Sequence, residues 1–387
     1  MEDLVGLCPK RANDSFFKTL PSTINIYCVG GAVRDFLLGK SYSDRDFVLV
    51  GADLDDFKKK GLKAVGKKFP VFLHPNTNEE IALARKEKKH GVGYKGFVFF
   101  TGKEVSLEDD LRRRDFTINA MAVDEHGNLH DPFGGRKDLS CKTIKHVSPA
   151  FVEDPLRVIR LARFLTQLTE FKVHKDTYDL CKEIVKRKEI LTLSKERIWT
   201  EIEKGFGGRK PINMINFLID CGAWEEITGS SHVSTELHLF LESVKTKKVS
   251  LEWIVANIFQ NEELENVHCT FPKAVQTAIN VLKRTKVCRD NYIDTHKNCN
   301  DKCSLILDIF EQGNLFRNPA NLTDFLNVSF YKYPKQKKIL ADCFEFLSEV
   351  SLKPIIDSNH KEIGIKSAIR EYRAEKLQEF MLVKNYS

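Results

Sequence analysis

The hydrophobic pattern of this chain changes once, near residue 154, and this change limits the folds that it can adopt. Upstream, short strand-like runs such as INIYCVGG (residues 24–31) alternate with helix-like stretches such as AVRDFLLG (residues 32–39). Downstream, apolar residues recur almost everywhere at helical spacing, beginning with DPLRVIRLARFLTQL (residues 154–168). The pattern predicts an α+β protein, in which a head of mixed sheet and helices is followed by helices alone.

Three regions are expected from this pattern: a head (residues 1–145), a helical neck (residues 146–225) and a helical body and tail (residues 226–387). The neck helix opens with Asp154 at a plausible N-cap and Pro155 at the first helical position. In the head, VFLHP, EEIALAR and GFVFF have strand character, and INAMAV after RRDFT is expected to begin a helix.

The composition indicates a folded protein that lies outside the membrane. Hydrophobic residues make up 42% and charged residues 30% of 387 residues, which excludes a largely disordered chain. No apolar run is long enough for a transmembrane helix, and the opening MEDLVGLCPKR is acidic where a signal peptide is basic. We therefore expect a cytoplasmic location and no membrane partner. The net charge of +7 is compatible with a polyanionic partner without demonstrating one.

The ten cysteines are scattered along the chain and indicate reduced thiols rather than a disulfide framework. The tightest group of metal-binding residue types, His296, Cys299 and Cys303, lacks the paired CxxC spacing of a structural zinc site. Zinc is therefore not expected.

A glycine pair and two aspartates form the first chemical motif, GGAVRD followed by DRD. Asp44 and Asp46 are two residues apart, so on a strand they point to the same face and repel unless a divalent cation lies between them. Gly31 permits a close approach of backbone N–H groups to a phosphate, and Arg34 adds a charged donor. These are the parts of a metal-dependent phosphoryl or nucleotidyl transfer site. The alternative is a turn glycine pair beside an acidic strand end.

The second motif is the arginine triplet Arg112–Arg114 in RRRDFTINA. Placed before an expected helix, these positive charges would oppose the helix dipole, and a bound anion nearby would remove the conflict. Two further motifs follow, DPFGGRKDL (residues 131–139), which could be a purely structural connector, and EDPLRVIR (residues 153–160).

Taken in order, GGAVRD…DRD, RRDFTINA, DPFGGRKDL, EDPLRVIRLARF and ERIWTEIEK resemble the signature motifs of the class II tRNA nucleotidyltransferase and poly(A) polymerase family. The stretches between them resemble the bacterial CCA-adding members more than the poly(A) polymerases. The resemblance covers roughly residues 24 to 225. It implies a polymerase-β-like nucleotidyltransferase head followed by an all-α neck, body and tail.

The resemblance also assigns roles to residues of this chain. Asp44 and Asp46 match the catalytic carboxylates that hold two Mg²⁺ ions, and Glu80 is a weaker candidate for a third acidic group near them. The nucleotide-binding positions that it implies are Gly31 and Arg34 for the triphosphate, Arg114 for the nucleotide, Asp115 with Asn119 near the ribose, and Asp154, Arg157 and Arg160 on the neck helix.

The implied activity is the addition of C, C and A to the tRNA 3′ end from CTP and ATP. The alternatives are a poly(A) polymerase, an enzyme restricted to the CC or A step, or an inactive RNA-binding relative. No histidine after residue 225 is followed by Asp, so an HD phosphohydrolase activity is not expected and the tail is expected to bind tRNA. The sequence does not predict an oligomeric state.

Two finer hypotheses concern nucleotide choice. Cytosine and adenine both present an amino donor beside a ring-nitrogen acceptor, and Asp154 with Arg157, three residues apart on one helix face, could supply the matching acceptor and donor. Alternatively, Asp154 only caps the helix and Arg157 pairs with it. The glycine- and lysine-rich segment 85–103 is expected to contain a mobile loop beside the site, or else an ordinary hairpin.

Overall fold

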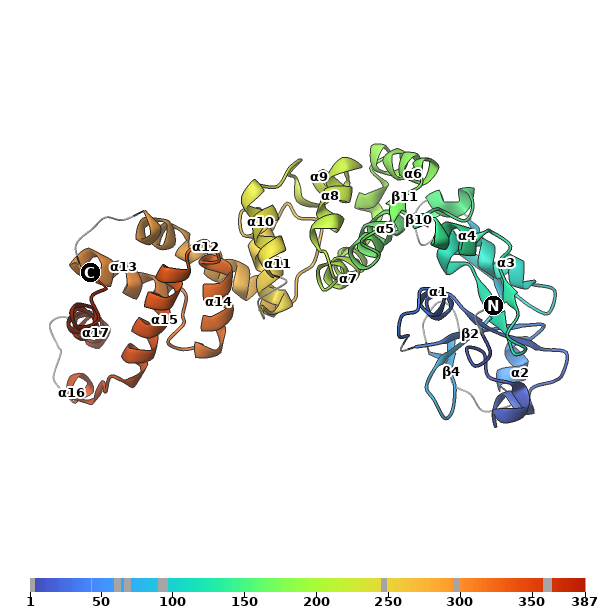
Figure 1. Cartoon of the computed structure of the whole chain (residues 1–387), viewed down its shortest axis with the longest axis horizontal. Coiled ribbons are helices and arrows are strands. Elements are labelled where there is room, and N and C mark those ends of the chain that lie inside the picture. Colours follow the sequence, from blue (N-terminus) through green and yellow to red (C-terminus); the bar gives the residue numbers. More distant parts are fainter. Residues whose placement is uncertain are drawn as a thin grey trace. The chain divides into compact units, whose positions relative to one another are not determined.

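The computed structural model describes residues 4–42, 44–58, 64–65, 71–89, 97–244, 249–294, 299–357 and 364–386. It divides into two compact units, coloured blue to green and mainly yellow to red in Figure 1. Unit 1 comprises residues 1–201 and 216–226, and unit 2 comprises residues 202–215 and 227–387. The expected boundary between head and neck at residue 145 stays a prediction, because unit 1 contains both regions.

Unit 1 is built on a mixed seven-stranded sheet with the strand order β3-β4-β5-β2-β1-β8-β9. Its strands are β1 (Asn25–Val29), β2 (Asp46–Val50), β3 (Ala64–Val65), β4 (Val71–Leu73), β5 (Glu80–Leu83), β8 (Ala122–Asp124) and β9 (Leu129–His130). Strands β2 and β5 are parallel, and their register pairs Asp46 with Glu80. The other strand pairs of the sheet are antiparallel.

The central strands are buried, which explains why they read as continuous apolar runs. Ile26, Cys28 and Val29 of β1 are at most 1% exposed, and Phe47, Val48 and Leu49 of β2 at most 2%. Because Asp46 directly precedes this buried run, the strand holds its carboxylate at the edge of the core. The structure thus confirms the expected mixed sheet with helices.

The helices of unit 1 are short in the head, whereas α5 and α6 in the neck are longer (Figure 1). They are α1 (Gly31–Leu37), α2 (Leu54–Lys58), α3 (Leu107–Arg112), α4 (Gly135–Ser140), α5 (Leu156–Gln167), α6 (Lys175–Lys186) and α9 (Ala223–Thr228), with 3₁₀ turns at Arg11–Asn13, Phe17–Thr19, Thr117–Asn119, Pro149–Glu153 and Glu189–Thr192. Helices α7 (Lys195–Phe206) and α8 (Ile212–Asp220) contribute residues to both units. A short parallel pair, β10 (Thr143–Ile144) with β11 (Lys172–Val173), joins the head to the neck.

Two sequence expectations in the head are wrong. INAMAV does not begin an α-helix: a single 3₁₀ turn (Thr117–Asn119) leads into β8, which pairs with β1 and β9 and whose residues Ala122 and Val123 are buried. The arginine triplet does not precede a helix either. Arg112 is the last residue of α3, where positive charge is favourable to the helix dipole, so the conflict that suggested a bound anion does not exist.

The segment 85–103 contains the strands β6 (Arg85–Lys89) and β7 (Phe97–Thr101), which pair as antiparallel neighbours. This pairing confirms the prediction that the segment contains the two antiparallel strands of a hairpin. Residues 90–96, on which the expectation of a mobile loop falls, lie outside the described residues.

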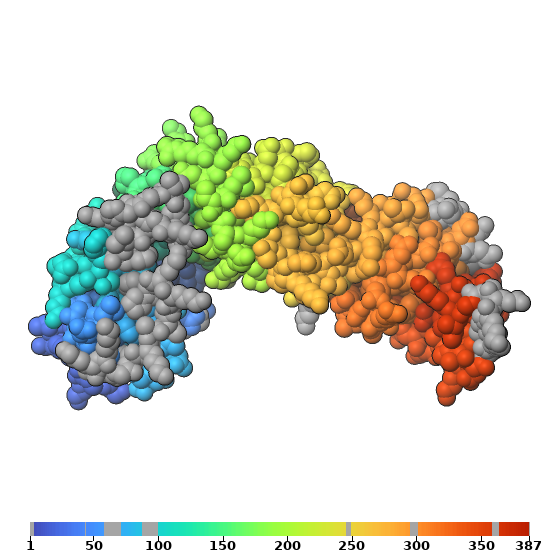
Figure 2. All heavy atoms as spheres, turned by 180° about the vertical axis from the view of Figure 1, so that it is seen from behind, coloured from blue at the N-terminus to red at the C-terminus, as the bar shows by residue number. Residues whose placement is uncertain are grey.

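Unit 2 is helical throughout its described part, as the pattern predicts. Its helices are α10 (Thr235–Ser243), α11 (Leu251–Phe259), α12 (Lys273–Ile293), α13 (Cys299–Gln312), α14 (Leu322–Ser329), α15 (Pro334–Glu349), α16 (Lys353–Ile356) and α17 (Ile365–Val383). Figure 2 shows the atoms of the whole chain as spheres, with those of unit 2 mainly in yellow to red. Across the described helices of the chain, none combines the length and apolar character needed to cross a membrane.

Candidate active site

Two pockets in unit 1 meet at the start of α1 and the start of β2. The first, which we call the arginine pocket, has a volume of about 550 Å³. Every nucleotide-binding residue expected from the sequence lines this pocket, namely Gly31, Arg34, Arg114, Asp115, Asn119, Asp154, Arg157 and Arg160. Its lining also includes Asp46, Arg85, Arg113, Arg163, Phe164 and Arg197. The second, which we call the acidic pocket, is lined by Asp44, Asp46 and Glu80, among others. Gly31 and Asp46 border both pockets.

The acidic pocket has the donor chemistry of a divalent-cation site. Asp44 lies two residues before Asp46, and the strand register places Glu80 opposite Asp46. The pKa of Asp46 lies above its ordinary value, because protein surrounds much of the group and because Glu80 and Asp44 carry like charge. Carboxylate oxygens that repel one another fit Mg²⁺, which prefers oxygen ligands and would neutralise their charge. Within the described residues, no group of three or more His, Cys, Asp or Glu side chains is arranged to hold a metal, so Glu80 is not shown to be a third ligand.

The glycine pair places α1 against the arginine pocket. Gly30 has a φ of +78°, and a Cβ atom there would lie 2.9 Å from Arg114 Nη1, so a side chain would collide with that guanidinium. Arg34, one turn into α1, donates to Asn119 Oδ1 at 2.7 Å and to both oxygens of Asp35 at 2.8 and 2.9 Å. These contacts fix the Arg34 guanidinium on the pocket wall.

Asp115 is the most fully bonded residue of the arginine pocket. Its Oδ2 accepts two N–H groups of Arg160 at 2.8 and 2.9 Å, while Oδ1 accepts the Asn119 amide at 3.0 Å and the Phe116 N–H at 2.8 Å. Burial opposes its ionisation, but Arg160 and these hydrogen bonds outweigh it and lower the pKa of Asp115 to about 2. With four hydrogen bonds already accepted, this carboxylate supports its neighbours, and the ribose role expected for it stays a prediction.

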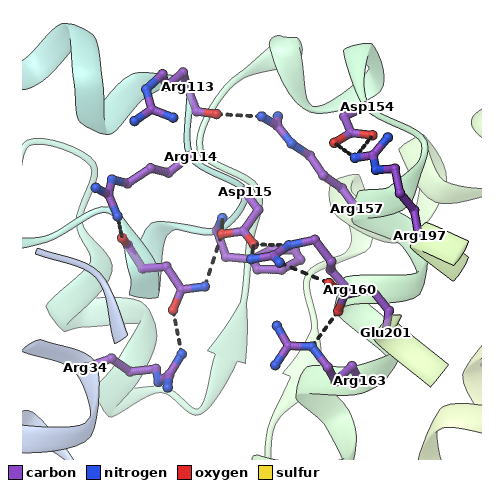
Figure 3. Close-up of polar contacts among 12 residues, drawn as sticks. Arg34, Arg113, Arg114, Asp115, Asp154, Arg157, Arg160, Arg163, Arg197 and Glu201 are labelled. Carbon is purple, nitrogen blue, oxygen red and sulfur yellow. Dashed lines mark hydrogen bonds and ion pairs between the residues drawn. The ribbon is translucent and has the colours of Figure 1, made fainter. Parts of the chain in front are cut away.

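A second buried carboxylate, Glu201 of α7, secures the far side of Arg160. It accepts from Arg160 Nη1 at 3.2 Å and from Arg163 Nε at 2.6 Å, and only 5% of it is exposed. Arg163 also lies over the ring of Phe164, with 4.4 Å between its guanidinium carbon and the ring centroid. Figure 3 shows the resulting series of contacts, from Glu201 through Arg160, Asp115 and Asn119 to Arg34.

Two arginines of the triplet, Arg113 and Arg114, are anchored by Asp110 of α3, which is completely buried. Its carboxylate accepts from Arg113 at 2.7 and 3.0 Å and from Arg114 at 3.3 Å. It also accepts the backbone N–H of Arg85 at 3.4 Å, where β6 begins. Burial disfavours the charge, yet these arginines keep the pKa of Asp110 below its ordinary value. Asp110 therefore fixes two arginines of the pocket and touches the base of the hairpin.

The neck positions Asp154 and Arg157 are held separately. Arg197 of α7 donates to Asp154 Oδ2 at 2.9 Å and Oδ1 at 3.3 Å, and the Leu156 N–H also reaches Oδ1, at 3.2 Å. Arg157 donates to the Ala150 carbonyl oxygen at 3.0 Å and to the Arg113 carbonyl oxygen at 2.5 Å, the second of which Figure 3 shows. Helix α5 itself begins at Leu156 with Pro155 at its N-cap, so the expected start, with Asp154 as N-cap and Pro155 as the first helical residue, is wrong by one position; Asp154 lies before it in extended conformation. Asp154 thus does contribute to the helix start, and both side chains line the arginine pocket.

Sequence reasoning missed the supporting residues Asp110, Arg163, Arg197 and Glu201. Asp110 could have been found, because it precedes Arg113 and Arg114 by three and four residues on a helix turn. Arg197 and Glu201 share one face of α7 in the quoted ERIWTEIEK, but no local pattern indicates that they face α5.

Comparison with known proteins shows which family the chain resembles. A family model described as the poly(A) polymerase head domain matches residues 26–145. The CCA-adding enzyme of Pseudomonas putida is 37% identical over 370 residues, which cover 92% of this chain and 98% of that enzyme. The CCA-adding enzyme of Coxiella burnetii is 52% identical over 202 residues, which cover 52% of this chain and 54% of that enzyme. In such higher-identity matches, the chain spans about half the length of the curated relatives.

Solved structures give the same fold. The Thermotoga maritima CCA-adding enzyme in complex with tRNA superimposes with a TM-score of 0.66 at 20% identity, over 92% of this chain and 88% of that one. A CCA-adding enzyme in complex with CTP gives a TM-score of 0.67, also at 20% identity, over 94% and 92% of the two chains. At this identity the likeness establishes the fold alone.

The head of this protein is therefore a nucleotidyltransferase head of the poly(A) polymerase type. Because the likeness to the Pseudomonas putida enzyme extends over nearly the whole chain, the protein belongs to the family of CCA-adding enzymes.

Proposed function

We propose that the protein is a CCA-adding tRNA nucleotidyltransferase, which adds C, C and A to the tRNA 3′ end and uses CTP and ATP. The observation that carries this proposal is the junction of the two pockets at Gly31 and Asp46, which joins an arginine-rich wall to a pair of carboxylates. The first suits a nucleoside triphosphate, and the second suits the cation that accompanies it. A cytoplasmic location is part of the proposal, because tRNA is used there.

In each addition, the terminal 3′ oxygen of tRNA forms a bond to the α-phosphorus of the incoming nucleotide, and the bond from that phosphorus to the pyrophosphate oxygen breaks. Arg34 and Arg114 bind the triphosphate, and the N-terminal backbone of α1 at Gly31 lets a phosphate oxygen come close. Asn119 bonds to Arg34 and to Asp115, and Asp115 bonds to Arg160. Asn119 and Asp115 therefore keep the guanidinium groups of Arg34 and Arg160 oriented. Asp154 and Arg157 read the pairing edge of the base.

Asp44 and Asp46 are the proposed catalytic carboxylates, which would hold two Mg²⁺ ions. When bound, Mg²⁺ lowers the pKa of the attacking hydroxyl and neutralises charge on the departing pyrophosphate.

The test uses a tRNA transcript that lacks its CCA end, incubated with Mg²⁺ and one labelled nucleotide at a time. The proposal predicts two C additions with CTP alone and a final A when ATP follows. Continued A addition would instead indicate a poly(A) polymerase, and incorporation of C alone or A alone would indicate a partial enzyme. No incorporation by folded protein with any nucleotide would refute the proposal.

A further inference from the structure

A third pocket, which we call the body pocket, lies within unit 2 and has a volume of about 600 Å³. Side chains of α11, α12 and α14 and of the residues after α14 line it. Those used below are Gln260, Lys286, Arg289, Ser329 and Lys332. The proposed nucleotidyl transfer makes no use of this pocket.

The wall of the body pocket contains a buried cation without an ion-pair partner among the described residues. Arg289 is only 7% exposed. Its Nη2 donates to two neutral acceptors, Leu282 O at 2.9 Å and Gln260 Oε1 at 3.3 Å. Burial lowers the pKa of Arg289 to about 10, opposed by the charge of its neighbour Asp290. A buried guanidinium that is not neutralised by a carboxylate is strongly unfavourable, so its retention calls for a physical reason.

Two buried polar atoms at this pocket have no hydrogen-bond partner within the described structure. They are Arg289 Nε and Ser329 Oγ. Buried donors are almost always satisfied in folded proteins, and an orphaned pair on one pocket indicates an absent acceptor. An anion with several oxygen atoms would offer acceptors of this kind.

The acidic side chains of the body pocket do not supply this acceptor. Glu236, Asp290 and Asp294 are exposed, so solvent screens their charges, and Glu236 is already paired with Lys332 at 3.0 Å. Burial raises the pKa of half-buried Glu262, a shift that the charges of Lys283 and His232 oppose, and no ion pair joins Glu262 to Arg289 among the described residues. Among the charged side chains that line the pocket, Arg289 is thus the buried one, and no described carboxylate pairs with it.

We propose that the body pocket binds a phosphate group through Arg289. The planar guanidinium suits phosphate oxygens, and the Ser329 hydroxyl is a further donor of the lining. Lys286 adds an exposed positive charge at the pocket, whereas the charge of Lys332 is already paired with Glu236. The phosphate belongs either to a free phosphate compound or to the backbone of a bound RNA. Both sources offer the same group to Arg289.

The test compares the full-length wild type with Arg289→Met in a phosphate-free buffer to which inorganic phosphate is then added. Arg284→Met is the matched control, because Arg284 is an exposed arginine on the same helix and does not line the pocket. Phosphate also stabilises proteins generally and can enter the arginine pocket, effects that all three chains share. We expect the melting temperature of the wild type and of the control to rise by about 2 °C more than that of Arg289→Met.

A second measurement separates the two sources of phosphate. If the phosphate is that of RNA, Arg289→Met weakens tRNA binding by about fivefold or more relative to Arg284→Met at fixed salt. If it is a free compound, tRNA binding is unchanged and the thermal response alone is lost. Equal responses of Arg289→Met and the control in both measurements overturn the proposal. If Arg289→Met does not fold, Arg289→Gln replaces it in both. The thermal measurement is independent of CCA addition, so its outcome is separate from that of the proposed function.

Discussion

Arg197 Nη2 lies 2.9 Å from Asp154 Oδ2, although 43 residues separate the two in sequence. The contact crosses from α7 to the residue before α5, and it holds the carboxylate that we expect to accept a hydrogen bond from the base. Arg157, only three residues from Asp154, is held instead by main-chain oxygens of Ala150 and Arg113. Acceptor and donor are thus positioned independently, which supports their use as two separate contacts to one base edge.

Exchange of this acceptor and donor should change the nucleotide preference. In a chain carrying Asp154→Arg with Arg157→Asp, we expect poorer use of CTP and ATP and measurable competition by UTP or GTP, in single-nucleotide incorporation assays. A capping role alone would lower stability by about 1 kcal/mol and leave the preference unchanged. An unchanged preference in a less stable protein would therefore remove the base-reading hypothesis.

Substitution of either proposed catalytic carboxylate should abolish transfer and leave the fold intact. Asp44→Ala and Asp46→Ala remove oxygen ligands that the reaction needs, while they relieve the like-charge repulsion seen around Asp46. We expect an unfolding free energy equal to or slightly above that of the wild type when metal is absent, measured by urea denaturation. Extension of tRNA by either variant at more than a few per cent of the normal rate would contradict the assignment.

Neutralisation of Asp110 should weaken nucleotide binding through the arginines that it anchors. Asp110→Asn leaves Arg113 and Arg114 without their buried countercharge, so we expect KM for CTP and ATP to rise about tenfold, with a smaller change in kcat. Asp109→Asn is the matched control, because Asp109 is the adjacent carboxylate and bonds to Ser106 and Lys86 instead. A role confined to stability would lower the melting temperature of Asp110→Asn and leave both KM values unchanged.

Because of Asp115, the free energy of unfolding should depend on pH. Its pKa falls from 3.8 in the unfolded chain to about 2 in the native state. A lowered native pKa stabilises the fold above the unfolded value, and this contribution disappears as the pH falls from about 4 to 2. We expect the wild type to lose about 2 kcal/mol more unfolding free energy across this interval than Asp115→Asn does. Asp179→Asn, which removes an exposed carboxylate, should keep the wild-type dependence.

Removal of Lys88 to Val92 tests the hairpin between β6 and β7. If residues of this segment help the site change from CTP to ATP, the deletion impairs A addition more than C addition. The comparison uses tRNA ending in CC against tRNA lacking all three nucleotides. An equal loss of both activities would indicate a structural role for the hairpin.

The sequence predicted the fold well because the patterns that define it are local. The glycine turn before α1, the buried run after Asp46 and the helical spacing beyond residue 154 each depend on a few adjacent residues. The error at INAMAV has a physical cause, since a strand buried on both faces and a buried helix segment both read as continuous apolar runs. The arginine triplet was misplaced for a related reason, because the helix lies before it in LEDDLR and not after it.

The contacts that support the site could not be predicted from local sequence patterns. The contacts of Glu201 with Arg160 and of Arg197 with Asp154 span about 40 residues, and they depend on how α5 and α7 pack. Motif resemblance located the residues that would contact a nucleotide. It could not show which buried carboxylates hold them in place.

The series of contacts from Glu201 to Arg34 also affects the entropy of each binding event. These side chains are bonded to one another before a nucleotide arrives, so their rotamers need not be frozen when it binds. Immobilising a long side chain costs about 0.5–1.5 kcal/mol, and a site that accepts three nucleotides in succession would meet this cost three times. A rigid wall confines the adjustment between C and A to the few groups that face the base, and affinity for both nucleotides can be similar without remodelling the pocket.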